Sequence, residues 1–476
     1  MRRTRWMAVA LAGALVLAAC GDDDDEGSGS DTTAAATTAA PDTTAGGADT
    51  TAAPDTTSAP DTTEAPDTAA FEVDTEACED PDAATAPIEG DIKVGTSLPL
   101  SGGPAVLFAP YADGFKAFWE AYNAQGGVGG TQKVDYTIKD DQYTANLTKT
   151  AVDEMIDEGV QVFTGIIGSP NNAAVRDDLN ALCYPQMFAS TGANAWGDIE
   201  SYPWTSGLLV PYSVESAAFH DFALTQKPEG GTAAIFYVNN EFGQAYVKSF
   251  KKVAEEEGLI EIVAEEKIDA ADSGAPTAQM TNLVAADPDF ILAIPLGAQC
   301  IAFMKELGNA RAANAEFTPV VYQTATCANP IFFGGAGAGA DGVFTSSNLL
   351  PEVYSTPNPA SPGPKAYADA LRAVKGDANP TNTAAAAGYL AAEFTAHVLE
   401  EAQKSDTGIT RASVINAMRN INFQSSLTQP GYPAIMNAED GFIGEVTQIT
   451  QWSAAESIFK PVGDIISFEG ETLYTD

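Results

Sequence analysis

The chain has 476 residues, which is enough for two to three domains. Its 65 Asp and Glu outnumber its 23 Lys and Arg, and the formal net charge at pH 7 is −42. A surface this acidic repels phosphate backbones, so we expect no nucleic-acid partner.

Residues 1–20 have the features of an export signal. Three arginines in the first five residues precede an apolar stretch, residues 6–19, that is too short for a comfortable membrane span. The stretch runs into Leu17-Ala18-Ala19-Cys20, which resembles the cleavage site of a bacterial lipoprotein signal peptide. In that family the cysteine is lipidated and becomes the mature N-terminus. The resemblance implies an exported protein anchored through Cys20 to the outer face of the cytoplasmic membrane. The alternatives are an export signal with an incidental cysteine and a twin-arginine signal, whose motif is incomplete here.

Residues 21–75 are of low complexity. A run of acidic residues is followed by a degenerate Ala-Pro-Asp-Thr-Thr repeat, which occurs four times between residues 40 and 69. This composition has almost no large apolar side chain and cannot bury enough surface to offset its chain entropy. Proline and charge repulsion stiffen such a segment, so we predict a disordered acidic stalk and then an N-terminal extension over residues 76–90. The threonines beside proline are also candidates for O-glycosylation.

From residue 91 onward, strand-like segments alternate with helical ones. Residues 92–98 are typical of a buried strand, and Phe115, Phe118, Trp119 and Tyr122 recur at the spacing of one helix face. Further strands are predicted at 133–139, 160–166, 186–189, 232–238, 261–267, 289–294, 318–322 and 342–346. Further helices are predicted at 145–158, 173–182, 242–257, 276–286 and 298–311. Strands separated by helices form parallel sheets with right-handed crossovers, so we predict an α/β chain of two doubly wound parallel-sheet lobes.

The cysteines fit an oxidising compartment. Four remain once Cys20 is set aside for lipidation, and an even number in an exported chain predicts disulfides. Four cysteines allow three pairings, of which we predict Cys78–Cys183 together with Cys300–Cys327. None of the spacings matches a metal knuckle or a redox CxxC motif.

The remaining motifs do not indicate an enzyme. Residues 126–130 are rich in glycine, but they follow a helix and precede a strand, the reverse of a dinucleotide loop, so a turn is predicted. Residues 334–339 lack the Lys-Ser or Lys-Thr of a Walker loop and are predicted as a loop before the strand at 342–346. His220 and His397, the only histidines, have no ligand-spaced partner. We therefore predict no catalytic residue, no metal and no cofactor.

Three loops at the ends of predicted strands are candidates for ligand binding. They begin at Ser101, Gly168 and Ser190, and ligands of open α/β sheets bind beyond the carboxyl ends of the strands. Hydroxyls and free backbone N–H groups at a helix N-terminus suit a carboxylate or another anion. The alternative is that Ser169 or Asn171 only caps the helix predicted at 173–182.

Several segments together resemble the leucine/isoleucine/valine-binding proteins, and the resemblance covers residues 91 to about 470. It rests on Ile92 to Gly102, on Asn123 to Gly130, on Asp140-Asp141, on Thr164 to Ser169, and on Asn239 to Ala245. Membership implies two lobes joined by three hinge strands that close on a small solute. Lobe 1 would comprise residues 91–209 and about 348–444, and lobe 2 residues 210–347 and about 445–476. A membrane permease and an ATPase would receive the solute.

The resemblance also implies roles for individual residues. Ser169 would bind a ligand carboxylate, and the loop that contains Ser190, Thr191 and Gly192 would assist. The walls would be formed by Leu107 and Phe108 in lobe 1 and by Phe242, Leu296 and Thr324 in lobe 2. Amino-acid binders hold the ligand ammonium with a second-lobe carboxylate, and the aligned residue here is Thr324. A buried ammonium without a counter-charge is costly, so we expect a more apolar site that suits an uncharged or carboxylate-only ligand.

We therefore predict an exported, lipid-anchored and monomeric solute-binding protein of a branched-chain-amino-acid-type ABC importer. The solute would be an amino acid, an amide or an apolar carboxylate. One alternative is an extracellular sensor lobe that signals through a partner after the same closure. Another is a secreted hydrolase, which the scarcity of histidine and the lack of a nucleophile elbow disfavour.

Overall fold

The computed structural model describes residues 70–272 and 274–469. The predicted export signal, Cys20 and the predicted stalk up to residue 69 lie outside these ranges. Within the described ranges, no helix combines the length and the apolar character that crossing a bilayer requires. The described side chains also include no cluster of three or more His, Cys, Asp or Glu able to hold a metal ion.

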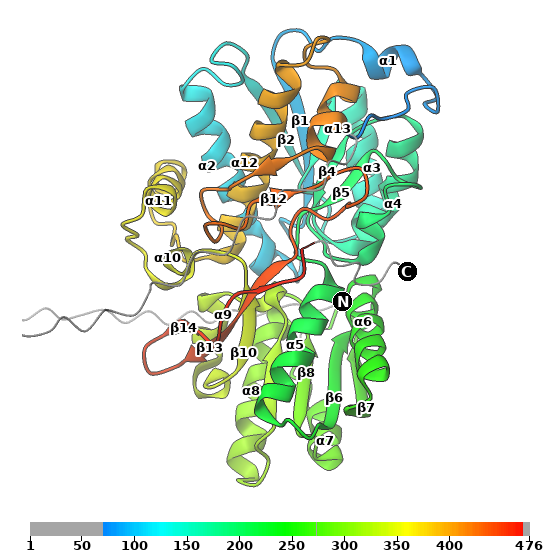
Figure 1. Cartoon of the computed structure of the whole chain (residues 1–476). Helices are drawn as coiled ribbons and strands as arrows, with labels where there is room; N and C mark the ends of the chain where they lie inside the picture. The colour runs from blue at the N-terminus through cyan, green and yellow to red at the C-terminus, as the bar shows by residue number, and fades with distance from the viewer. Residues whose placement is uncertain (1–69, 273, 470–476) are drawn as a thin grey trace, which may run out of the picture. The chain divides into compact units, whose positions relative to one another are not determined.

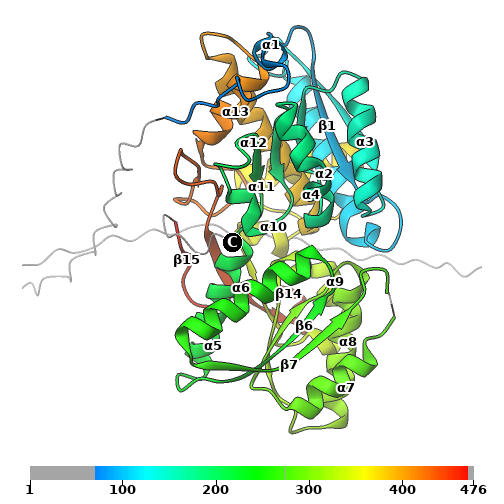
Figure 2. The same ribbon diagram turned by 90° about the vertical axis from the view of Figure 1, so that its right-hand side faces the viewer.

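Lobe 1 is built on a parallel five-stranded sheet in the order β2-β1-β3-β4-β5 (Figure 1). Its strands are β1 (Ile92–Leu98), β2 (Val134–Asp140), β3 (Val162–Thr164), β4 (Gln186–Ala189) and β5 (Thr205–Gly207). Its helices are α1 (Pro81–Thr85), α2 (Ala105–Ala124), α3 (Ala145–Asp157), α4 (Ser169–Ala181), η1 (Asn194–Gly197), α11 (Pro362–Val374), α12 (Thr383–Gln403) and α13 (Arg411–Arg419). Helices cover both faces of the sheet, with α3 on one side and α12 on the other (Figure 2). This arrangement explains why β1, β3 and β4 are almost wholly buried.

Lobe 2 contains the larger sheet, in the order β14-β13-β10-β9-β8-β6-β7, with β15 paired to β13. Its strands are β6 (Gly231–Val238), β7 (Ile260–Ile268), β8 (Phe290–Ile294), β9 (Val320–Gln323), β10 (Phe344–Ser347), β13 (Val446–Ser453), β14 (Ile458–Pro461) and β15 (Ile466–Ser467). The strands from β6 to β10 pair in parallel, whereas β13 joins β10 antiparallel. Its helices are α5 (Tyr212–Gln226), α6 (Glu241–Glu257), α7 (Thr277–Ala286), α8 (Ala298–Ala313), η2 (Ala325–Cys327), α9 (Pro330–Ala336) and η3 (Gly337–Ala340).

The chain passes between the lobes three times. It leaves β5 for α5 through residues 208–211, and it leaves β10 for α10 (Pro351–Ser355) through residues 348–350. The third passage leads to β13 from the small ribbon of β11 (Asn422–Phe423) and β12 (Ala434–Ile435). Two parallel-sheet lobes joined in this way confirm the predicted fold class.

Two helices differ from expectation, one in its start and one in its existence. α4 begins at Ser169 rather than near residue 173, because Pro170 fits its first turn. The prediction of a loop at residues 334–339 was wrong, since α9 runs to Ala336 and η3 follows it. Asn329 starts α9 by accepting a hydrogen bond from the Ile331 N–H. Among the glycines of this segment, Gly339 serves packing: a Cβ there would lie 2.1 Å from the Met304 carbonyl oxygen on α8.

The structure contains both predicted disulfides. Cys78 and Cys183 have Cα atoms 5.6 Å apart, and those of Cys300 and Cys327 are 5.8 Å apart. The first disulfide fastens the N-terminal extension to lobe 1 next to α4, where the Glu79 N–H also donates to the Ala181 carbonyl. The second fastens η2 to the first turn of α8.

Candidate functional site

A cavity of about 160 Å³ lies where the two lobes and their crossovers meet, and we call it the interlobe cavity. Its walls come from α2 and α12 in lobe 1, from α5, α6, β10 and the η2 region in lobe 2, and from the first two crossovers. The lining residues are Leu107, Phe108, Tyr111, Ile167, Ser190, Leu208, Leu209, Val210, Tyr212, Glu215, Tyr246, Ala325, Thr326, Ala328, Ser346, Ser347, Asn348, Leu349, Thr383, Ala384, Ala387, Leu390 and Thr447.

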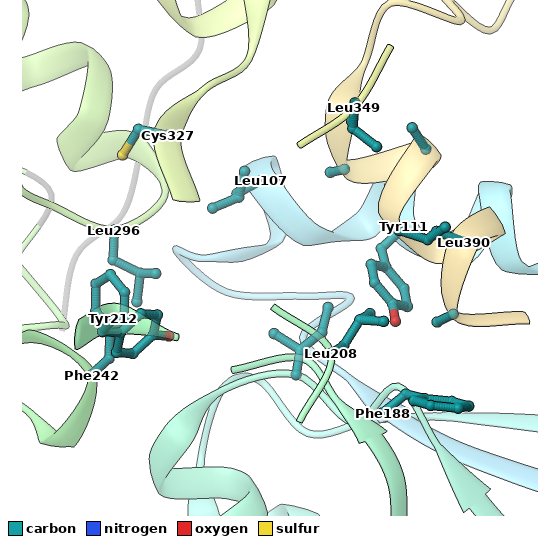
Figure 3. Close-up of a cluster of buried hydrophobic side chains, with 14 of the residues drawn as sticks. Leu107, Tyr111, Phe188, Leu208, Tyr212, Phe242, Leu296, Cys327, Leu349 and Leu390 are labelled. Carbon is teal, nitrogen blue, oxygen red and sulfur yellow. The ribbon is translucent and has the colours of Figure 1, made fainter. Parts of the chain in front are cut away.

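The lobe 1 wall depends on close packing of α2 against α12. A Cβ on Gly114 would lie 1.8 Å from the Ala385 carbonyl oxygen, and one on Gly388 would lie 2.0 Å from that of Tyr111. Only glycine allows the two backbones to approach this closely. Their contact holds Leu107 and Tyr111 of α2 on the same wall as Leu390 of α12 (Figure 3).

Glu215 places a carboxyl group in the lobe 2 wall. It lies on α5 and is 2 % exposed. Its Oε1 accepts hydrogen bonds from the Tyr322 hydroxyl at 2.9 Å and the Ala325 N–H at 2.7 Å, and its Oε2 accepts one from the Tyr246 hydroxyl at 2.5 Å. Burial raises the pKa of Glu215, and these hydrogen bonds oppose that rise.

A network of hydroxyls lies beside the cavity at the strand ends of lobe 1. The Ser169 and Thr191 hydroxyls are 2.6 Å apart, and Thr191 Oγ1 also accepts a hydrogen bond from Trp196 Nε1 at 3.1 Å. The Tyr212 hydroxyl from lobe 2 lies 3.4 Å from Thr191 Oγ1. The Tyr212 ring in turn stacks on Tyr246, with centroids 3.9 Å apart. An aromatic side chain of lobe 2 therefore covers the Ser169–Thr191 pair.

Two hydrogen bonds join the lobes at the start of α12. Asn329 Nδ2 donates to Asn382 Oδ1 at 2.9 Å, and the Thr383 hydroxyl donates to the Ala328 carbonyl, also at 2.9 Å. Thr383 and Ala328 also line the interlobe cavity. These contacts hold the lobes together directly over the site.

The ligand-binding residues predicted from the sequence divide into three groups. Leu107, Phe108 and Ser190 line the cavity, and Ser190 Oγ lies 2.9 Å from the Tyr111 hydroxyl. A second group of predicted residues is buried but does not line the cavity. Its members are Ser169, Thr191, Gly192, Phe242, Leu296 and Thr324. Tyr212, Phe242 and Leu296 gather on one side in Figure 3, away from Tyr111 and Leu390.

Ser101 is not brought to the site. It is exposed, and its hydroxyl donates to Asp140 Oδ2 at 2.5 Å. The proposal that Ser169 or Asn171 caps α4 has no support either, because no side chain caps the described N-terminus of this helix at Gly168. For the other predicted residues, contact with a ligand stays a prediction.

Sequence reasoning missed Tyr111, Tyr212, Glu215 and Tyr246. Glu215 carried one usable signal, because residues 212–223 of α5 are apolar or small apart from Glu215, His220 and Asp221, and all of them except Asp221 are buried. A helix without a polar face is buried, so an acid within it is buried as well. The tyrosines carried no such signal, since aromatic residues at helical spacing are typical of any core.

The family model described as periplasmic binding protein matches residues 91–457. Among solved structures, a branched chain amino acid ABC transporter protein from Thermus thermophilus with bound valine has a TM-score of 0.70 at 18 % identity, covering 81 % of this chain and 98 % of its own. A fatty acid ABC transporter substrate-binding protein from Thermomonospora curvata has a TM-score of 0.68 at 19 % identity, covering 80 % and 94 %.

A solute-binding protein from R. palustris in complex with 4-hydroxybenzoate has a TM-score of 0.65 at 19 % identity, covering 79 % of this chain and 97 % of its own. No curated protein matches the chain. These identities show a shared fold, whereas the family model matches most of the chain. The chain belongs to the periplasmic binding protein family.

Proposed function

We propose that this chain is the solute-binding component of an ABC importer and works outside the cytoplasm as a monomer anchored through lipid on Cys20. It captures a small solute with a mostly apolar body between its lobes and delivers it to a permease and an ATPase in the membrane. The observation that carries this proposal is the interlobe cavity, whose walls come from both lobes and are largely apolar. In this role the chain makes and breaks no covalent bond.

The size of the cavity supports a small solute. Its volume of about 160 Å³ is close to that of the engineered apolar cavity of about 150 Å³ that holds benzene. Leu107, Leu208, Leu349 and Leu390 line it together with several alanines, which suits a short alkyl chain or a single ring. The hydroxyl groups of the lining and the Glu215 carboxyl group can accommodate one polar end of the solute.

Closure between the lobes supplies the mechanism. A solute that contacts both walls binds the closed arrangement more tightly than any open one, so it shifts the population toward closure. The bonds from Asn329 to Asn382 and from Thr383 to Ala328 form only when the lobes meet, so they add to that preference. A permease that recognises the closed form then receives loaded protein selectively.

The test begins with a thermal-shift screen of the purified chain against amino acids, amides, amines, aromatic acids and short fatty acids. A solute at about 100 times its Kd adds roughly 2.7 kcal/mol to the free energy of unfolding. Calorimetric titration then measures the Kd of each hit. Uptake of the bound solute by cells that contain a permease and an ATPase, compared with cells that lack them, separates import from sensing.

A pair of variants shows whether hits occupy the interlobe cavity. Ala387→Leu adds three carbons within the cavity, whereas Ala312→Leu makes the same change on an exposed part of α8. We expect Ala387→Leu to weaken binding at least tenfold and Ala312→Leu to leave the Kd within twofold. Equal affinity in both variants, or no hit in the whole screen, would contradict the proposal.

A further inference from the structure

The charges that line the interlobe cavity are one-sided. Among the described residues that line it, Glu215 is the only carboxylate and none is Lys, Arg or His. The groups that donate to Glu215 are two tyrosine hydroxyls, one backbone N–H and the Ser346 hydroxyl, all of them neutral. An ionised Glu215 is therefore well hydrogen-bonded but has no positive partner in this wall.

The geometry points to Glu215 as the residue that decides which polar end a solute can have: it admits an ammonium or an N–H donor and rejects a free carboxylate. This inference rests on the proposed function, because it takes the interlobe cavity as the solute site. It names the solute class as small molecules with an apolar body and one cationic or hydrogen-bond-donating end.

The hydrogen-bond inventory of Glu215 leaves one place for a solute. A carboxylate offers about four acceptor positions, two on each oxygen. Oε1 already accepts from Tyr322 and Ala325, and Oε2 accepts from Tyr246. The remaining acceptor position faces the Ser346 hydroxyl, which also lines the cavity and lowers the pKa of Glu215. A solute that reaches this position therefore takes the place of a neutral hydroxyl. An N–H group can donate there, and a carboxylate cannot.

The opposite wall offers a carboxylate little in exchange. The Ser169 and Thr191 hydroxyls, which the family resemblance assigns to a ligand carboxylate, are bonded to each other. Tyr212 covers them, with its hydroxyl 3.4 Å from Thr191 Oγ1. A carboxylate that entered the cavity would thus face the Glu215 charge with no basic side chain to offset it. The structure therefore reverses the preference for a carboxylate that Thr324 suggested in the sequence.

Three probes of matched length test the inference on the unaltered chain: pentylamine, pentanamide and pentanoate, each titrated at pH 7.5. We expect pentylammonium to bind most tightly, pentanamide next, and pentanoate at least tenfold more weakly than pentylammonium. A tenfold difference is the scale of one charge-assisted hydrogen bond. This order needs no variant, so it stands as a test even if a change at Glu215 prevents folding.

Two variants locate the effect. Glu215→Gln keeps the shape and removes the charge, and we expect it to weaken pentylammonium binding at least tenfold while pentanamide stays within about threefold. Glu393→Gln is the matched control, because Glu393 is another carboxyl whose pKa burial raises, and it accepts from Ser425 outside the cavity. It should leave all three affinities within twofold.

The outcomes separate this inference from the proposed function. If pentanoate binds more tightly than pentylammonium, or Glu215→Gln leaves pentylammonium binding unchanged, the role of Glu215 is wrong and the solute site stands. If the three probes fail while other solutes bind and Ala387→Leu blocks them, the solute class is wrong and the site again stands. If nothing binds in the whole screen, the proposed function itself fails.

Discussion

At the scale of single residues, Glu215 is the group whose environment departs most from that of an ordinary acid in this site. Every polar contact named for it comes from a neutral donor, and the titratable groups that face it are Tyr212, Tyr246 and Tyr322. Burial is the largest influence on Glu215 and raises its pKa above the ordinary value of 4.5. Protons and a cationic solute therefore compete for the same carboxylate.

This competition predicts a pH dependence for solute binding. As the pH falls through the raised pKa of Glu215, we expect the affinity for pentylammonium to decrease, with a limiting slope of about tenfold per pH unit. Above that pKa the affinity should be constant. Glu215→Gln should lose the slope, and Glu393→Gln should keep it. A Kd for pentylammonium that stays constant from pH 4 to pH 8, while the circular-dichroism spectrum of the chain is unchanged over that range, would contradict this account.

The contribution of Glu215 to the free energy of unfolding, measured without solute, should decrease as the pH rises, whereas the affinity for pentylammonium increases. The folded chain holds the Glu215 proton more tightly than the unfolded chain, because the folded pKa is the higher one. The contribution of Glu215 is thus most favourable at pH values below 4.5. It is lost as the pH rises through the raised pKa.

The residues of the site also show what the sequence could and could not reveal. Leu107 and Phe108 were found because their segment aligns with a known family. Glu215 was not found, because the family resemblance places the second-lobe carboxylate at the position of Thr324. The structure instead supplies a carboxyl group from α5. Which helix brings an acid into a cavity depends on lobe packing, and 65 acidic residues hide the relevant one.

At the scale of elements, the strands and most helices were predictable because buried parallel strands and amphipathic helices have distinct periods. The ends of α6 were close to expectation because its sequence carries both kinds of cap. Asn240 accepts from the Gly243 N–H at the start, and Gly258 adopts a φ of 67° at the end. α9 was missed because its glycines suggested a loop. The η3 turn that follows α9 packs against α8 through a contact distant in sequence, between Gly308 and Gly339.

Two helix caps form one of the contacts between the lobes. Asn329 caps α9 in lobe 2 by accepting from the Ile331 N–H, and Asn382 caps α12 in lobe 1 by accepting from the Ala384 N–H. The two asparagines also bond to each other, with Asn329 as the donor. Each side chain therefore starts its own helix and helps to hold the lobes closed.

This double role predicts that two similar substitutions differ in effect. Asn329→Asp keeps its own cap but loses the donor for Asn382, so we expect faster solute dissociation and a loss of affinity of about fivefold to tenfold, on the order of 1 kcal/mol. Asn382→Asp keeps both the cap and the acceptor, so its affinity should stay within about twofold. Stopped-flow dissociation rates with any confirmed solute test this. Equal rates in the two variants would show that the bond between the lobes contributes nothing.

At the scale of the whole molecule, the two disulfides serve different regions. Cys78–Cys183 lies in lobe 1 and closes a separation of 105 residues between the N-terminal extension and the end of α4. The residues just before the extension are bound to lobe 1 at α13, through hydrogen bonds from the Phe71 and Val73 N–H groups to the side chains of Asn420 and Asn416. The first described residues therefore lie on lobe 1.

Cys300–Cys327, by contrast, lies beside the site. Cys327 is in η2, between Thr326 and Ala328, which both line the interlobe cavity. Nearby, the Ala325 N–H donates to Glu215. Removing this disulfide frees the segment that shapes the lobe 2 wall, whereas removing Cys78–Cys183 frees only the extension.

We therefore expect the paired serine variants of the two disulfides to have separable effects. Cys78→Ser with Cys183→Ser should lower the free energy of unfolding by about 2–5 kcal/mol and speed hydrogen exchange over residues 70–90, with the solute Kd within twofold. Cys300→Ser with Cys327→Ser should lower stability by a similar amount and weaken solute binding at least fivefold, because the bond from Ala325 to Glu215 loses its support. Denaturant unfolding, hydrogen exchange and calorimetry on both variants make the comparison. Loss of solute affinity in the Cys78 variant would mean that the extension communicates with the site, and retained affinity in the Cys327 variant would mean that the lobe 2 wall is shaped without its disulfide.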